Sequence, residues 1–406
     1  MQSVLRFFFN INSLYKFIPF IILFIYGPGI LMAFFRLGPT AEVLEFLAIF
    51  ATSIVAYFCF YYLFQIVLRR RFVVGGGISM ISIAILFFGL YTIYIVYVLF
   101  TAQKIPLVLA FQGASSAEIS HYRELFFKAR TGFDVVLVYL NAVFTVALMP
   151  FILAGLYIVK YKYRHFYLLF FLFTLLLSME KSLILRALLP LIVLIVNGNV
   201  VDKYLTFKRL VLALFLGLFM VSFLALGNFS SDEVQLLSEL IEIDPNTAKY
   251  FIVSNPDSVT QFMLNRIFWI PYITAIDWLS FFNEVLHREL VLGASSSFVS
   301  GLFGMERLNL ERLVFEFEWG QNESGTGSSN VVYFIDIFLN FGWLGVISSN
   351  AVLAFVVRFF ETSDNAAAKA SFFVYAYFIC TSTLVGVLLS GGMLILMFVT
   401  MVIKKV

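Results

Sequence analysis

Residues 17–35 read FIPFIILFIYGPGILMAFF, an apolar run without a charged residue that begins directly after Lys16. A helix needs about 20 such residues to cross the roughly 30 Å hydrocarbon core of a bilayer. Similar runs recur along the chain near 43–68, 78–101, 133–159, 166–179, 183–197, 209–227, 331–357, 371–387 and 388–403. The sequence therefore predicts an all-α polytopic membrane protein with about ten transmembrane helices, in one transmembrane domain over residues 1–406.

The composition also indicates lipid as the solvent. Hydrophobic residues make up 62% of the 406 residues and charged residues only 13%, whereas about a quarter of a soluble globular protein is charged. The net charge of +3 gives no indication of nucleic-acid binding. The two cysteines, Cys59 and Cys380, lie inside apolar runs, so neither a disulfide framework nor a Cys/His metal site is expected.

The basic residues predict the orientation of the chain. With the N-terminus inside, the short cytoplasmic segments hold more than half of the 27 Lys and Arg residues, which is the bias that marks the cytoplasmic side. Both termini are then cytoplasmic, and residues 228–330 form a large extracytoplasmic loop. Stretches 234–243 and 259–286 of this loop have apolar residues at helical spacing, which predicts helices on the outer membrane surface or over a cavity between spans.

Several charged residues are expected at the outer face. An arginine at membrane depth is costly, so it snorkels, pairs, or lines a polar cavity. Arg123 and Arg130 precede the fourth span, where Arg130 either anchors that span or binds a ligand. Glu180, Lys181 and Arg186 belong to a polar segment between two short spans, and they form either a structural ion pair or a ligand-facing site. Arg266 lies among apolar and aromatic residues.

Cations that converge from separate segments suit a diphosphate. Guanidinium groups bind phosphate with paired hydrogen bonds and stay charged, and they stabilise a departing diphosphate without a metal.

Three stretches carry a resemblance to a known family: NRIFWIP at 265–271, Leu292-Gly293, and SNVVYFIDIFLNFGWLG at 329–345. They resemble the Wzy-type O-antigen and oligosaccharide repeat-unit polymerases. The resemblance implies a glycosyltransferase fold of the GT-C type and a metal-independent enzyme without a cofactor. Its substrates would be undecaprenyl-diphosphate-linked oligosaccharides, joined into O-antigen or a similar surface polysaccharide at the periplasmic face of a bacterial inner membrane. A flippase and a chain-length regulator would be its partners.

The expected site combines both lines of reasoning. Arg123, Lys181, Arg186 and Arg266 are expected to bind diphosphate or stabilise the transition state, with Glu180 and Asp336 as further catalytic residues. Substrate binding is assigned to Arg130, His121, Tyr122, Asn330 and Asn340, of which Asn340, like Asp336, matches the family's motif. The general base is left open among Glu180, Glu323, Asp336 and His121.

Two other functions are compatible with the sequence. The first is an O-antigen ligase or another lipid-sugar-dependent GT-C glycosyltransferase, which a different product distinguishes from a polymerase. The second is a flippase or transporter of the lipid-linked oligosaccharide, against which the long outer loop argues.

Overall fold

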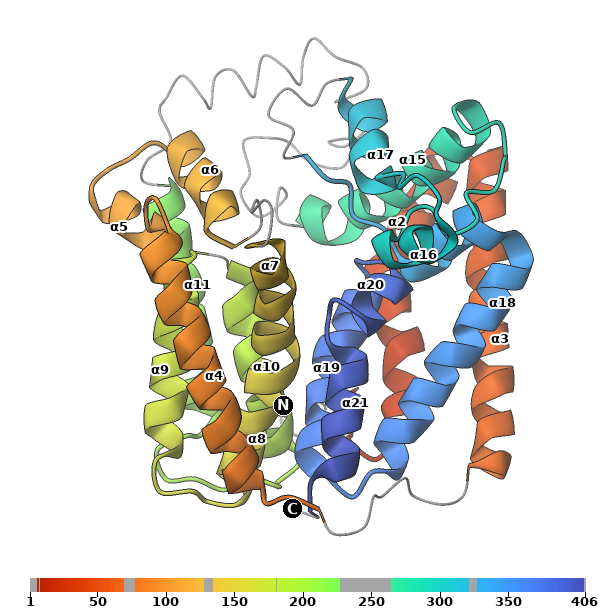
Figure 1. Cartoon of the computed structure of the whole chain (residues 1–406). Coiled ribbons are helices and arrows are strands. Elements are labelled where there is room, and N and C mark those ends of the chain that lie inside the picture. Colours follow the sequence, from red (N-terminus) through yellow and green to blue (C-terminus); the bar gives the residue numbers. More distant parts are fainter. Residues whose placement is uncertain are drawn as a thin grey trace.

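The computed structural model describes residue 6 and residues 8–68, 77–127, 134–179, 181–226, 264–320 and 327–404. Every regular element in these ranges is a helix, apart from a single bridge between Ile78 and Ile403. The helices stand side by side and short helices cover one end of them (Figure 1). Their bounds are η1 Leu14–Lys16, α2 Phe17–Leu37, α3 Ala41–Val67, α4 Met80–Thr101, α5 Pro106–Phe111, α6 Ser116–Phe127, α7 Val135–Ala142, η3 Val143–Leu148, α8 Met149–Ile158, α9 Arg164–Leu177, α10 Lys181–Val196, α11 Phe207–Leu226, η5 Asn265–Trp269, α15 Ile270–Glu284, α16 Ser297–Phe303, α17 Leu310–Trp319, α18 Tyr333–Thr362, α19 Ala366–Ile379, α20 Leu384–Leu388 and α21 Met393–Val402.

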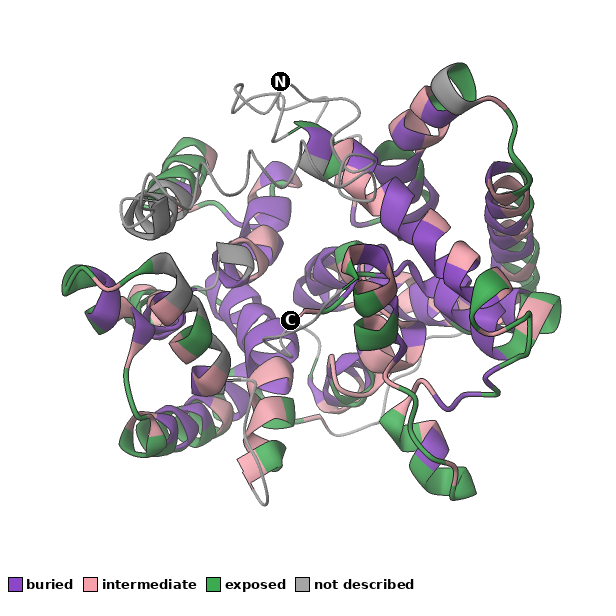
Figure 2. Ribbon diagram, turned by 90° about the horizontal axis from the view of Figure 1, so that it is seen from above, coloured by how far each residue is buried: buried purple, intermediate pink, exposed green. Residues whose placement is uncertain are grey.

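Six helical segments among the described residues are long and apolar enough to cross a membrane: Leu14–Phe35, Ala41–Val67, Met80–Thr101, Val135–Ile158, Tyr333–Thr362 and Leu384–Val402. Three shorter apolar helices are Arg164–Leu177, Leu183–Val196 and Ala366–Ile379. The chain is therefore a helical protein of the membrane-spanning type, and the count of ten spans stays a prediction. Seen from above, the central helices are largely buried and the outer ones carry exposed positions (Figure 2). Apolar side chains on that outer surface, such as Ile66, Ile93 and Phe100, are compatible with lipid.

The predicted bounds of the ninth span were wrong. The run 371–387 is divided, because α19 ends at Ile379 and α20 begins at Leu384. The polar residues between them form the start of the next helix, where the Thr383 hydroxyl accepts a hydrogen bond from the Gly386 N–H at 3.1 Å. Such a side-chain cap satisfies an N–H group that has no partner within the helix. Hydropathy alone did not show this break.

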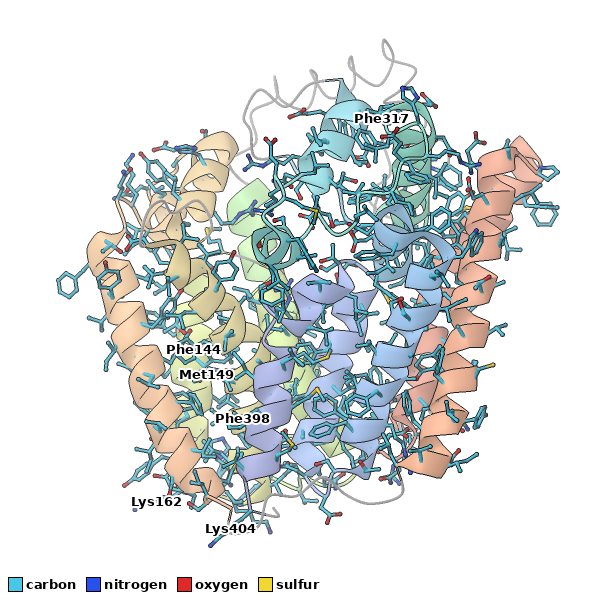
Figure 3. All side chains as sticks on the ribbon, turned by 45° about the vertical axis from the view of Figure 1, so that its right-hand side comes forward. Phe144, Met149, Lys162, Phe317, Phe398 and Lys404 are labelled. Carbon is cyan, nitrogen blue, oxygen red and sulfur yellow. The ribbon has the colours of Figure 1, made fainter. Side chains whose placement is uncertain are left out.

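Basic residues of the predicted cytoplasmic segments that the structure describes, among them Arg6, Arg164 and Lys404, lie at one end of the molecule. Arg6 donates to the Val196 carbonyl, the Lys404 N–H donates to the Ile78 carbonyl, and Arg164 pairs with Asp202. Lys162 and Lys404 mark this end in Figure 3, and Phe317 of α17 lies at the opposite end. The basic segments and the helices α15 to α17 thus lie at opposite ends.

Helix α15 and the π-helix η5 before it are packed into the protein. Of the predicted helix at 259–286, the structure describes the part from Leu264 onward, and Trp269 and Trp278 in it are fully buried. Gly29 of α2 makes this packing possible, because a Cβ there would lie 2.4 Å from Cβ of Tyr272. This segment is therefore packed against other helices of the protein, and it is not a helix that lies on the membrane surface. The predicted helix at 234–243 lies outside the described residues.

Helix α18 folds back on itself at Gly342, whose φ of 59° and ψ of −151° interrupt the helix. The hydroxyl of Tyr333 donates to Oδ1 of Asn350 at 2.8 Å, although 17 residues separate them. A straight helix would place them about 25 Å apart at 1.5 Å per residue. The first half of α18 therefore crosses the top of the molecule, and the second half runs down through it (Figure 1).

Candidate functional site

A cleft of about 740 Å³ lies at the end of the molecule that carries α15 to α17. Its walls come from segments that are far apart in the sequence: α7 and the start of η3, the turn before α16, the start of α17, the first half of α18, and α20 with the residues after it. Pockets of this size accommodate small-molecule ligands. The cleft is therefore a candidate ligand-binding site. A second, smaller hollow beside it is described below.

The fold-back of α18 builds the floor of the cleft. The carbonyls of Leu339 and Asn340 lie just before the bend at Gly342. They accept hydrogen bonds from the N–H groups of Val291 and Leu292, at 3.1 and 3.0 Å. The segment that leads to α16 thus pairs with the end of the first half-helix.

Asn340 connects this segment to Asp336. Its Oδ1 accepts from the Gly293 N–H at 2.9 Å and from the Ser295 hydroxyl at 3.1 Å. Its Nδ2 donates to the Asp336 carbonyl at 2.8 Å and to Oδ1 of Asp336 at 3.1 Å. Residues four apart lie on one face of a helix, so the pair points into the cleft together. Asn340 therefore orients Asp336.

Asp336 is only 1% exposed, yet it lines the cleft. Its Oδ1 accepts from Nδ2 of Asn340 at 3.1 Å. The Ser295 hydroxyl has one proton, which it donates either to Oδ1 of Asp336 at 3.4 Å or to Oδ1 of Asn340 at 3.1 Å. A carboxylate that is oriented in this way at the base of a cleft can accept a proton from a ligand hydroxyl.

Glu311 and Arg307 line the same cleft from the start of α17. The Ser329 N–H donates to the Glu311 carbonyl at 2.8 Å, and the Ser328 hydroxyl donates to its carboxylate at 3.3 Å. Burial raises the pKa of the Glu311 carboxyl above its ordinary value of 4.5, although the Ser328 hydrogen bond and the charge of Arg307 act in the opposite direction. The cleft thus holds a second carboxyl group.

We expect Glu311→Gln to raise the melting temperature near neutral pH. A carboxyl whose pKa is raised by folding holds its proton more tightly in the folded state, so its contribution to stability is lost as pH rises from the ordinary value of 4.5 through the folded pKa. The glutamine has no such charge to bury. Melting curves of both proteins across pH test this, and the two should converge below about pH 4.5. A stability difference that grows on acidification would contradict the expectation.

A second hollow, of about 300 Å³, adjoins the cleft and shares Glu311, Thr383, Gly386 and Ser390 with it. Arg186 of α10 lines it, with the guanidinium carbon 4.1 Å from the ring centre of Phe378. A cation over an aromatic ring is attracted by the ring's quadrupole and held in place. The hollow thus adds an oriented cation to the Glu311 carboxyl group that it shares with the cleft.

The structure brings together only part of the predicted site. Asp336 and Asn340 share the cleft, and Arg186 lies in the adjoining hollow. His121, Tyr122 and Arg123 lie on α6, which lines neither the cleft nor the hollow. The ammonium group of Lys104 lies over the Tyr122 ring, 4.7 Å from its centre. Asn330 is exposed just before α18. Their roles stay predictions.

The other predicted residues fall partly or wholly outside the described part of the chain. Arg266 belongs to the π-helix η5 and Lys181 begins α10, but the side chains of both lie outside the description. Glu180, Arg130 and Glu323 lie outside the described residues altogether. The convergence of Arg123, Lys181, Arg186 and Arg266 on a diphosphate stays a prediction.

Sequence reasoning missed Glu311, Arg307 and Ser295. The signal for Glu311 was the short amphipathic helix Leu310–Trp319, whose start faces the cleft. Ser295 lies two residues after Gly293, and the pairing of that segment with α18 makes it a cleft residue. Among the described residues, no group of three or more His, Cys, Asp or Glu side chains could hold a metal ion.

The fold and the site define a helical membrane protein with a carboxyl-lined cleft at one end. No protein-family model matches the chain, and neither a curated protein nor a solved structure matches it.

Proposed function

We propose that the protein is a glycosyltransferase that polymerises oligosaccharide repeat units carried on a polyprenyl diphosphate. The observation that supports this most is the buried Asp336 at the base of the cleft, held by Ser295 and Asn340. Asp336 and Asn340 belong to the stretch 329–345, which resembles the Wzy-type polymerases. The cleft also lies at the end of the molecule opposite the basic segments.

The proposed topology has ten spans with both termini in the cytoplasm of a bacterial cell, which places the cleft at the periplasmic face of the inner membrane. It is supported by the position of Arg6, Lys162, Arg164 and Lys404 at the end opposite the cleft, because short basic loops remain in the cytoplasm. Lipid-linked substrates would then reach the cleft from the outer leaflet.

In the proposed reaction, a hydroxyl on the terminal sugar of one lipid-linked repeat attacks the anomeric carbon of the growing chain. Asp336 takes the hydroxyl proton as the new glycosidic bond forms. The bond between the anomeric carbon and the diphosphate oxygen breaks, and the diphosphate leaves with its electron pair. General-base help of this kind contributes typically 10²–10⁴-fold in rate.

Arg186 would receive the diphosphate. Its guanidinium is oriented over Phe378 in the hollow that joins the cleft, and charge-assisted hydrogen bonds to phosphate are stronger than neutral ones. Arg123, Lys181 and Arg266 remain proposed partners in this role.

We expect Arg186→Ala to lower polymer synthesis by roughly tenfold to a hundredfold, because one hydrogen bond to a charged group contributes about 1.5–3 kcal/mol. Arg186→Lys keeps the charge but loses the planar fork, so its effect should be smaller. Polymer produced per amount of membrane-inserted protein is the measurement. Equal loss in both variants, together with a lowered melting temperature, would indicate a structural role instead.

The proposed function is tested by the product that the purified protein forms from a lipid-linked repeat unit in vesicles. A polymer that stays on the lipid carrier supports the proposal. Transfer to lipid A would identify a ligase, addition of a single sugar would identify another glycosyltransferase, and movement of intact substrate across the vesicle membrane would identify a transporter. Each of the last three results overturns the proposal.

A further inference from the structure

The second hollow has its own chemistry. It is lined by α7 and η3 on one side and by α10, α19 and α20 on the others, with Glu311 shared with the cleft, and its lining includes Asn141, Thr145, Arg186, Tyr375 and Phe378. Its volume of about 300 Å³ is at the lower end of the range for small-ligand pockets. It offers room for one ring rather than for a chain of rings.

Most of the hydroxyl groups in this lining are satisfied locally. Thr145 donates to the Asn141 carbonyl at 2.8 Å, and Ser390 donates to the Gly386 carbonyl at 3.1 Å. Tyr375 donates to the Gly391 carbonyl at 3.2 Å. The O–H groups of Thr145, Ser390 and Tyr375 thus have acceptors within the chain.

Asn141 is different. Its side-chain oxygen Oδ1 is buried and accepts no hydrogen bond from any part of the chain that the structure describes. A buried polar group without a partner has lost its hydrogen bonds to water without replacement, so an asparagine here lowers the stability of the empty protein. Asn141 also lies just before the π-helix η3, and such helical irregularities are frequent at functional sites.

The lining indicates which ligand would satisfy Asn141. An amide oxygen needs a hydroxyl or N–H donor, while Arg186 provides donors for ligand oxygens or negative charge. Phe378 and Tyr375 add aromatic surface. A pyranose that carries a diphosphate combines these features: ring hydroxyls, an apolar ring face, and an anionic group on the neighbouring atom.

We propose that this hollow binds the reducing-end sugar of the growing chain, the ring bonded directly to the diphosphate, with a ring hydroxyl donating to Asn141. Arg186 holds the diphosphate beside it. This inference rests on the proposed function and makes Asn141 a residue that selects the first sugar of the repeat unit.

The first experiment compares Asn141→Leu with Asn350→Leu. Asn350 is fully buried and has all its partners, since it accepts from Tyr333 at 2.8 Å and donates to the Val346 carbonyl at 2.8 Å. We expect Asn141→Leu to raise the melting temperature by about 1–3 °C while polymer synthesis falls roughly tenfold, as loss of one ligand hydrogen bond predicts. Asn350→Leu should lower the melting temperature, and it serves as a control for stability alone, because Asn350 also holds the bend of α18. A lowered melting temperature in Asn141→Leu, or full polymer synthesis in that variant, overturns the proposal.

A second experiment needs no polymerase activity. Melting of the detergent-solubilised protein is followed with added galactose, glucose and their N-acetylamino counterparts. At least one sugar should stabilise the wild-type protein and Asp336→Asn, but neither Asn141→Leu nor Asn141→Ala. Stabilisation of all four proteins alike, or of none, overturns the sugar site. Failure of the proposed function alone would instead appear as sugar binding that depends on Asn141 without any polymer product.

Discussion

Polymer should disappear when Asp336 is replaced by asparagine. The substitution keeps the size of the side chain and its hydrogen bonds with Ser295 and Asn340, but it removes the group that takes the proton. Loss of a general base lowers the rate by typically 10²–10⁴-fold. We therefore expect long chains to be absent in a host that depends on this protein. The measurement is chain length and amount per molecule of membrane-inserted protein.

Glu361→Gln is the matched control. Glu361 is a partly buried carboxylate at the opposite end of the molecule, where it accepts from the Tyr61 hydroxyl at 2.6 Å and from the Tyr15 N–H at 3.0 Å. Glutamine keeps an acceptor for one of these donors. Polymer synthesis per folded molecule should therefore persist in Glu361→Gln. Wild-type chain length in Asp336→Asn would remove Asp336 from the mechanism, and equal loss in both variants would point to stability as the cause.

The membrane character and the pairing of Asp336 with Asn340 were predictable for simple reasons. Apolar runs such as 17–35 are local in the sequence and leave no alternative to a bilayer. Asp336 and Asn340 are four residues apart, so any helix through them presents both on one face. These inferences need no knowledge of tertiary contacts.

The rest of the site depends on such contacts. Glu311 reaches the cleft because the Ser329 N–H pairs with its carbonyl and thereby fixes the start of α17 beside α18. Nothing near Glu311 in the sequence specifies that pairing. Likewise, Asn141 reads as one polar residue in an apolar run, and only the packing of α7 beside α10 and α20 gives its side chain a hollow to face.

The fold-back of α18 could not be predicted from the sequence either. Phe341-Gly-Trp343 reads equally well as the start of a helix or as an interior position, because glycine is tolerated in both. The choice is made by the bonds across the bend, from Tyr333 to Asn350 and from Val291 to Leu339. Both bonds join residues that are distant in the sequence.

We expect Gly342→Asn to abolish polymer synthesis and to lower the melting temperature by several degrees. A φ of 59° with a ψ of −151° lies in a region that is essentially restricted to glycine, and a side chain there costs of order 1–3 kcal/mol. Crowding is not the cause, since the nearest atoms to an added Cβ are the methyl groups of Leu290 at 3.8 Å. The strain is relieved if the helix straightens, which separates Asp336 from Ser295. Melting curves and polymer synthesis, measured on the same preparations, test both effects.

Gly304→Asn isolates the cause, because Gly304 has nearly the same φ, 64°, but a ψ of 26°. That left-handed conformation accepts asparagine, and no atom lies within 4 Å of an added Cβ. The two variants thus introduce the same residue at nearly the same φ. They differ in ψ, and only Gly342 lies at the bend of α18 beside the cleft. If Gly304→Asn lowers polymer synthesis as much as Gly342→Asn does, the bend in α18 does not organise the cleft. If only Gly342→Asn loses polymer, the position of Asp336 depends on a backbone conformation that only glycine supplies.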